Sequence, residues 1–313
     1  MSLASTPAVA QGETLVANGA YIHSAPQDPT QIDAFASLTG KQPSIVMWYQ
    51  HWGDSADEAF NTQWLNDVST RGAMPIITWE PWNSQAGTKQ PLYALKKIAA
   101  GYHDTYIKSW ARGAKAYGRP FYLRFAYEMN GNWYPWCVGV NGNTSAHYVA
   151  AYRHVVEIFR QEGVTNVRFV WSPNIEYDGS TPLADLYPGD TYVDWVGMDG
   201  YNWGATEQWH TWQDLKEVFS ATYDKLANSQ GGIAPNKPLM IAETASTEVG
   251  GDKRAWIRQG FLTDLPTRFP KVQAVVWFNE DKETDWRVNS SASSLEAYKE
   301  VVANSYYQGR LPP

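Results

Sequence analysis

Residues 121–136 read FYLRFAYEMNGNWYPW. The run 121–126 is short, apolar and aromatic, which is typical of a buried β-strand. Asn130-Gly131 favours a turn, and Glu128 lies between the strand and that turn. Aromatic side chains follow at Trp133, Tyr134 and Trp136. A carboxyl group beside flat rings suits the cleavage of sugars, because the carboxyl group can supply a proton while the rings stack on the apolar faces of pyranoses.

Similar apolar runs recur along the whole chain. They give eight candidate strands: residues 19–22, 44–49, 74–79, 121–126, 167–171, 195–199, 239–243 and 274–278. Most show no polar alternation, as expected for parallel strands covered on both faces. Helical patterns lie between them, at residues 55–70, 105–117, 144–161, 207–228, 253–269 and 294–304. This alternation predicts an α/β fold, a single (β/α)8 TIM barrel. A doubly wound sheet is the alternative, but no Gly-rich phosphate loop follows the first strand.

The chain shows no internal boundary, since no linker, low-complexity tract or charge run divides it. We therefore expect one catalytic barrel domain over residues 1–313, with residues 1–12 being a tag and the N-terminal tail of the mature protein. Ala8-Val9-Ala10 fits the small-residue pattern before a signal-peptidase cut. This predicts a secreted protein, extracellular or periplasmic, whose signal peptide has been removed.

Composition excludes several classes of function. The formal net charge of −7 argues against nucleic-acid binding, which depends on basic patches. No apolar run approaches the roughly 18 residues of a membrane span. Cys137 is the single cysteine, and the six histidines show neither His-x-His nor His-Glu-x-x-His spacing. The sequence therefore predicts no metal site of these kinds and no cofactor, and a calcium ion held by Asp and Asn oxygens on a loop is the alternative left open. We also expect a monomer.

In the predicted barrel, residues just past each strand lie close together, because the C-terminal ends of all strands meet at one face. We call this concave face, where TIM barrels carry their active sites, the bowl. The polar and aromatic residues expected at this bowl are His51, Trp52, Glu80, Trp82, Glu128, Asn174, Glu176, Asp199, Tyr201, Glu243, Trp277 and Asn279. Glu128 and Glu243 end the fourth and seventh strands and can approach each other over its centre. A pair of carboxyl groups is what glycosidases use, about 5–5.5 Å apart in retaining enzymes and about 6.5–9.5 Å apart in inverting ones.

Other polar residues leave alternatives open. Glu80 is the main rival to the pair, although substrate hydrogen bonding or structural pairing suits it better. By period-two alternation, Arg124 is expected on the same face as Ala126 and Glu128. There it can hydrogen-bond Glu243 and keep it ionised, or form an ion pair inside the barrel. His51 can contact sugar hydroxyls, lie at the surface or cap a helix.

The chain resembles glycoside hydrolase family 26, a family of retaining (β/α)8 endo-β-glycanases, over essentially its whole length. The motifs that carry the resemblance are YEMNGNWYPW at 127–136, WSPN at 171–174, GMDGY at 197–201 and IAE at 241–243.

The resemblance implies roles for individual residues. It makes Glu128 the acid/base, Glu243 the nucleophile and Tyr201 a hydrogen-bond partner of that nucleophile. Trp277 would floor the subsite where the bond breaks, and Trp133 would stack on the leaving side. Asp199 is expected to be a further subsite contact or an orienting group. The expected substrate-binding set is completed by Tyr127, Arg124, His51, Trp136, Trp82 and Glu80.

One departure from the family pattern concerns specificity. Mannanases of the family usually carry His before the acid/base, where this chain has Tyr127, and the WYPW tail is closer to members that act on mixed-linkage β-glucan. The prediction is a retaining glycosidase that cleaves internal linkages of a plant or microbial β-glycan, either β-1,4-mannan or β-1,3-1,4-glucan. The alternatives are the same mechanism on β-1,3-xylan, β-1,3-glucan or an exopolysaccharide, and a non-catalytic carbohydrate-binding barrel.

Overall fold

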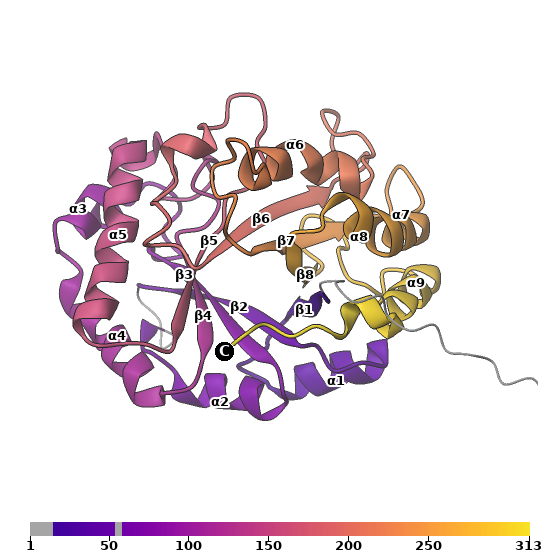
Figure 1. Ribbon diagram of the computed structural model, residues 1–313, viewed down its shortest axis with the longest axis horizontal. Coiled ribbons are helices and arrows are strands. Elements are labelled where there is room, and N and C mark those ends of the chain that lie inside the picture. Colours follow the sequence, from indigo (N-terminus) through magenta and orange to yellow (C-terminus); the bar gives the residue numbers. More distant parts are fainter. Residues whose placement is uncertain (1–14, 54–57) are drawn as a thin grey trace, which may run out of the picture.

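The computed structural model describes residues 15–53 and 58–313, which form a closed barrel of eight parallel strands (Figure 1). The strands are β1 Ala17–Ile22, β2 Ile45–His51, β3 Met74–Glu80, β4 Phe121–Phe125, β5 Val167–Trp171, β6 Trp195–Asn202, β7 Leu239–Ser246 and β8 Val272–Asn279. β1 pairs with both β2 and β8, so the sheet has no free edge. The predicted TIM barrel is confirmed, and the doubly wound alternative is wrong because that sheet stays open.

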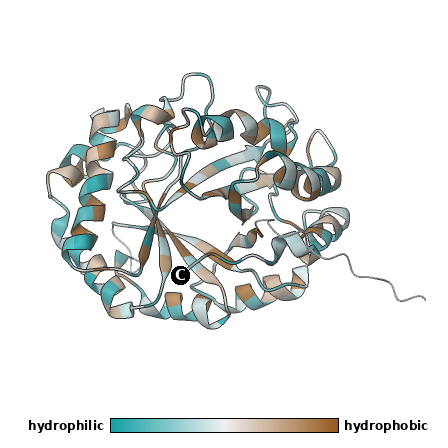
Figure 2. Ribbon diagram, in the orientation of Figure 1, coloured by the Kyte–Doolittle hydropathy of each residue, from teal (hydrophilic) through white to brown (hydrophobic). Residues whose placement is uncertain are grey.

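Side chains alternate between the barrel interior and the surrounding helices. An inner cluster fills the barrel: Ala17, Ile45, Met47, Ile76, Tyr122, Val170, Trp195, Met240, Ala242, Ala274, Val276 and Leu311. The intervening strand residues pack outward against the helices in a much larger core. Figure 2 shows hydrophobic colour along the strands and mixed colouring on the helices, as expected for helices with one solvent-exposed face.

Helices connect the successive strands around the outside. They are α1 Thr30–Thr39, α2 Thr62–Thr70, α3 Leu95–Ala99, α4 Asp104–Tyr117, α5 Ser145–Gln161, α6 Leu215–Ala227, α7 Lys253–Gln259, α8 Leu265–Arg268 and α9 Ala292–Ala303. Short 3₁₀ segments lie at Pro91–Tyr93, Val140–Gly142, Leu183–Asp185 and Ser305–Gln308. None of these helices in the described ranges combines the length and apolar character needed to cross a membrane.

Several helix limits differ from those predicted. The expected N-cap of α5 is present, since Thr144 Oγ1 accepts the His147 N–H at 3.2 Å. α6 begins only after Asp214, whose N–H is capped by Glu217 at 2.7 Å, so the predicted start at residue 207 is wrong. The expected helix 253–269 is interrupted by a π-helical turn at Gly260–Asp264, next to Pro266, which has no N–H to donate. α1 and α3 were not predicted.

Two predictions fall wholly or partly outside the described residues. The expected tag and tail at 1–12 lie there entirely. The predicted helix 55–70 begins there, and its described part is helical only from Thr62.

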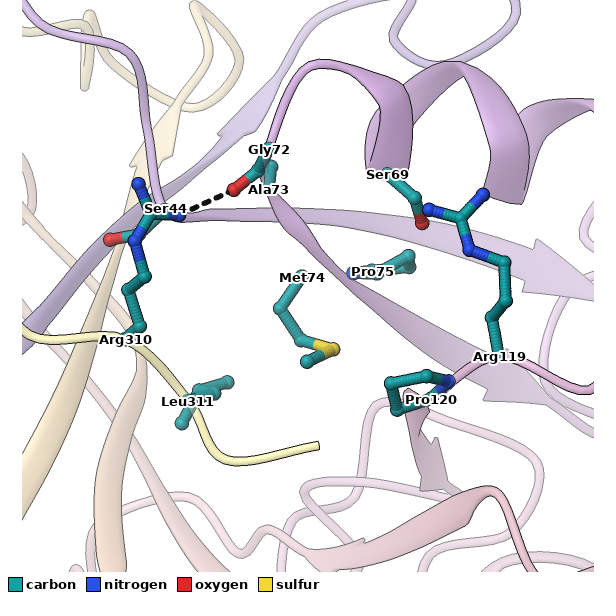
Figure 3. Close-up of a pocket in the computed structure, with 10 residues that line it drawn as sticks. All are labelled: Ser44, Ser69, Gly72, Ala73, Met74, Pro75, Arg119, Pro120, Arg310 and Leu311. Atoms are coloured by element: carbon teal, nitrogen blue, oxygen red, sulfur yellow. Dashed lines mark hydrogen bonds between the residues drawn. The ribbon is translucent and has the colours of Figure 1, made fainter.

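The N-terminal end of the barrel is closed by the chain's own C-terminal segment. Leu311 joins the inner cluster, and the Tyr122 hydroxyl donates to the Pro312 carbonyl at 2.9 Å. A hollow of about 200 Å³ remains beside it, lined by residues such as Met74, Pro120 and Arg310, with Arg310 hydrogen-bonded to the Gly72 carbonyl (Figure 3). This end of a TIM barrel generally serves stability, whereas chemistry occurs at the opposite end.

Candidate active site

Glu128 is held in a strained loop directly after β4. The residues Ala126 and Glu128 have φ angles of 46° and 50°, in the left-handed region that is unfavourable for residues with a Cβ. The Glu128 N–H donates to the Ser172 carbonyl at 2.8 Å, and Trp133 Nε1 donates to Glu128 Oε2 at 2.8 Å. Such strain persists where surrounding contacts over-determine the conformation, which is common at functional sites.

This turn corrects the predicted alternation. β4 ends at Phe125, so Ala126 and Glu128 do not continue its period-two pattern, and they do not share a strand face with Arg124. Arg124 nevertheless points into the barrel, where its guanidinium reaches the residues on β6 and β7 described below.

A bulge in β7 places Glu243. Against β6, Met198 pairs with Ile241 but Asp199 pairs with Glu243, so β7 contains one extra residue at this point. A bulge re-aims the side chains around it. Glu243 Oε2 accepts a 2.6 Å hydrogen bond from the Tyr201 hydroxyl, and Oε1 is bonded by Arg124 Nη2. The family resemblance implied the Tyr201 hydrogen bond, and the Arg124 hydrogen bond is one of the two alternatives left open for Arg124.

Arg124 links Glu243 to Asp199 below the surface of the bowl. Its Nη1 donates to both carboxylate oxygens of Asp199 at 2.9 and 3.0 Å, and its Nε donates to Thr78 Oγ1 at 3.0 Å. Asp199 is 0% exposed and also accepts from Ser172 Oγ at 3.1 Å. Asp199 is therefore no direct subsite contact. It orients Arg124, which in turn fixes Glu243.

The two carboxyl groups have different electrostatic surroundings. Burial, and next the negative charge of Glu243, raise the pKa of Glu128 from the usual 4.5 to about 8. Glu243 instead has a guanidinium and a phenol as donors. Burial, and next the charge of Glu243, raise the pKa of Tyr201 well above 10, so that phenol keeps its proton to donate. The two acids therefore differ: burial favours the protonated form of Glu128, whereas Glu243 accepts hydrogen bonds from a guanidinium and a phenol.

A second polar cluster lies at the ends of β2 and β3. Glu80 is buried, accepts from Trp82 Nε1 at 3.3 Å, and pairs in register with His51. Burial raises its pKa to about 7, opposed chiefly by the Trp82 hydrogen bond. Tyr127 lies nearby, with its ring 4.2 Å from the Arg124 guanidinium and its hydroxyl bonded to that of Tyr134.

Comparison with known proteins identifies the family. The model of glycosyl hydrolase family 26 matches residues 95–247, a segment that contains both Glu128 and Glu243. The chain belongs to this family.

Individual relatives are consistent with that assignment. The family 26 chain is 41% identical to Endoglucanase H of Acetivibrio thermocellus over 288 residues, which cover 91% of this chain and 30% of that protein. It is 29% identical to the beta-1,3-xylanase TXYA of a Vibrio species over 238 residues, covering 74% and 46% of the two chains. It spans less than half the length of both relatives. The catalytic domain of an endo-β-1,4-mannanase from Bacillus sp. JAMB-750 has the same fold, with a TM-score of 0.70, 20% identity and coverage of 94% and 87%.

Not all predicted aromatic residues of the family 26 chain lie in the bowl. Trp133 is 37% exposed beside Glu128, and Trp82 is half-buried beside Glu80. Trp136 is buried beneath them, stacked on Tyr134 at 4.4 Å, with its Nε1 bonded to the Tyr127 carbonyl. It supports the bowl and offers no face to a ligand.

The predicted subsite floor at Trp277 is wrong. Trp277 is 1% exposed, packs outward against Trp256 of α7 and Tyr298 of α9, and donates from Nε1 to the Trp286 carbonyl at 2.9 Å. Alternation along β8 explains this, since it is the next residue, Phe278, that turns inward to Tyr21 and Tyr201.

Trp277→Phe is expected to lower stability and to leave substrate binding intact. The smaller ring loses core packing and the hydrogen bond to Trp286, a cost of about 1–3 kcal/mol. Trp133→Phe is the matched control, because it should leave the melting temperature nearly unchanged and raise KM. Thermal denaturation and Michaelis kinetics of both variants check this. A raised KM with unchanged stability for Trp277→Phe would restore it to the subsite.

Several bowl residues of this family 26 chain were not predicted. Strict alternation along the predicted strands could have identified Tyr49, which packs against the inner cluster, and Phe278, which stacks on Tyr21. Trp286 packs on Tyr201 with ring centroids 5.1 Å apart, but it lies in an irregular loop that carries no periodic signal. Among the described residues, no three His, Cys, Asp or Glu side chains are grouped to hold a metal ion.

Proposed function

We propose that this chain hydrolyses internal linkages of a β-glucan, with mixed-linkage β-1,3-1,4-glucan as its substrate, by double displacement with retention of configuration. The observation that carries the proposal is the contrast between the two acids. Glu128 has a pKa raised to about 8, whereas Glu243 is held by Arg124 and Tyr201.

The proposed reaction follows from these surroundings. Glu243 attacks the anomeric carbon while Glu128 gives its proton to the leaving oxygen, which breaks the glycosidic bond and leaves a glycosyl ester on Glu243. Glu128, now ionised, takes a proton from water, and this water attacks the same carbon and releases Glu243. When Glu243 becomes an ester its negative charge disappears, so the pKa of Glu128 falls as Glu128 changes from acid to base.

The choice of glucan has its own support. The identity to Endoglucanase H is 41% over 91% of the chain, whereas a Bacillus subtilis mannan endo-1,4-beta-mannosidase matches at 26% over 64%. Tyr127 stands where mannanases of the family usually have His, and it lies against Arg124 at the floor of the bowl. A bulky phenol and the buried Glu80 beside it offer different hydrogen-bonding partners from an imidazole to the sugar at the bond to be cleaved.

A panel of polysaccharides tests the substrate. We expect reducing-sugar release from barley β-glucan at least about tenfold faster than from β-1,4-mannan, β-1,3-xylan or a β-1,3-glucan at equal concentration. The Glu243→Gln variant is the control for contaminating activity. Fastest release from mannan or β-1,3-xylan would reassign the substrate and leave the mechanism standing. No release from any of them would favour a carbohydrate-binding barrel.

A further inference from the structure

The Trp133 ring packs against Gly131, where a larger residue would clash with it. A Cβ on Gly131 would lie 2.6 Å from carbons of the Trp133 ring, closer than any real contact, so the ring rests directly against the main chain. The indole N–H points to Glu128 at 2.8 Å. One edge of the ring is therefore fixed at the proposed acid, while 37% of the residue stays exposed.

Tyr177 extends this exposed surface beside Trp133. Its ring centroid lies 6.0 Å from that of Trp133, the planes are inclined by 30°, and the residue is 41% exposed. Tyr177 belongs to the loop that follows β5. A turn anchors it there, since the Tyr177 N–H donates to Ser180 Oγ at 3.2 Å and the Ser180 N–H donates to the Tyr177 carbonyl at 3.0 Å.

The loops that carry the two rings are joined by Asn130. Its side-chain amide donates to the Asn174 carbonyl at 2.9 Å and accepts from the Asn174 N–H at 3.0 Å. The Thr181 N–H also donates to the Asn130 carbonyl at 3.4 Å. Asn130 is 1% exposed, so these hydrogen bonds are protected from water. The relative position of the rings is thus fixed before any ligand binds, which lowers the entropic cost of binding.

Two exposed rings whose planes are inclined by only 30° can each stack on the apolar face of one of two consecutive pyranoses. A single exposed aromatic residue is ordinary, but here the second ring adjoins one that is bonded to the proposed acid. The sugar on the leaving side must place its glycosidic oxygen at Glu128, so it lies over Trp133, and the next sugar of the leaving chain then reaches Tyr177.

We propose that Tyr177 is a sugar-stacking residue that, with Trp133, binds two consecutive β-linked pyranoses of the leaving chain. This depends on the proposed function, because Glu128 as proton donor defines the leaving side. It makes release of a single sugar from the reducing end inefficient and favours cuts that leave at least two sugars on the leaving side.

The test compares Tyr177→Ala with two substrates. An aryl β-cellobioside has only its aryl group on the leaving side, whereas a mixed-linkage gluco-oligosaccharide labelled with ¹⁸O at its reducing end can place two sugars there. We expect kcat/KM on the oligosaccharide to fall about tenfold, and the aryl glycoside rate to stay within about twofold of the parent. Mass spectrometry of the labelled products should show fewer cuts that release a disaccharide from the reducing end.

Matched variants separate stacking from folding. Tyr177→Phe keeps the ring and should retain parental rates. Tyr102→Ala removes a tyrosine that is 72% exposed and lies beside Lys97. It should leave kcat/KM on both substrates unchanged. Equal losses on both substrates with a lowered melting temperature would mean that Tyr177 is structural, and unchanged cleavage positions would also overturn the inference. If the parent cleaves manno-oligosaccharides instead, the same comparison applies to that series. A parent inactive on all of them would refute the proposed function itself.

Discussion

Glu243→Ala is expected to reduce kcat on β-glucan by at least about 10⁴-fold, because the proposed nucleophile is lost and no glycosyl ester can form on it. The fold should survive, since Arg124 retains its two hydrogen bonds to Asp199 at 2.9 and 3.0 Å when Glu243 is removed. The space left by the carboxylate can admit azide. With an aryl β-glycoside, azide should restore turnover and yield the α-glycosyl azide, because a single displacement inverts the anomeric carbon.

Glu80→Ala is the control that decides between the two acids. Glu80 is also buried in the bowl, so its loss tests whether any missing carboxylate would have the same effect. We expect it to weaken substrate binding, with no azide rescue. Proton NMR of the parent reaction gives the independent check, since retention predicts the β-anomer as the first product. Rescue of Glu80→Ala, or initial release of the α-anomer, would contradict the assignment of Glu243.

The fold was predictable because the barrel buries its strands on both faces. Apolar runs marked each of the eight strands, and the largest errors lie at C-terminal ends, although β1 and β8 also begin two residues earlier than predicted. β6 and β7 continue to Asn202 and Ser246, beyond the limits predicted at 199 and 243, because polar residues still hydrogen-bond within the ladder there. A pattern of hydrophobicity cannot detect such extensions, since the residues that make them face the polar bowl.

The site was predictable only where sequence position alone determines geometry. Glu128 comes after β4 and Glu243 lies in the C-terminal half of β7, close to where the strand pattern predicted them, but the left-handed turn after Phe125 and the bulge in β7 have no local signal. These two irregularities aim both carboxyl groups. For Trp277 a local pattern was available but was not applied. Strict alternation along β8 would have placed Trp277 outside the barrel and Phe278 inside. Contacts between loops, such as that of Asn130 with Asn174, depend on tertiary structure and could not be inferred.

Glu128→Gln is expected to remove the alkaline limb of the pH–rate profile along with most of the activity. Glu128 must carry its proton to act as an acid, and its pKa is raised to about 8, so the parent's kcat/KM should fall as pH rises through that value. Glutamine cannot donate a titratable proton, and we expect a loss of about 10²–10⁴-fold on oligosaccharides. Aryl glycosides with good leaving groups need little acid assistance and should be affected less in their first step.

Glu128→Gln should raise stability at alkaline pH while it lowers activity, and the two measurements together separate the acid from a merely structural carboxyl group. Because the pKa of Glu128 is higher in the folded state, the unfolded chain binds fewer protons between about pH 4.5 and 8, and parental stability falls as pH rises through this window. Glu128→Gln lacks that slope, so its melting temperature should exceed the parent's at pH 8 and approach it at pH 5. Glu80→Gln is the comparison, since Glu80 has a pKa raised to about 7 and should give a similar stability gain while keeping the alkaline limb near pH 8. An alkaline limb that disappears in Glu80→Gln and persists in Glu128→Gln would exchange the two assignments.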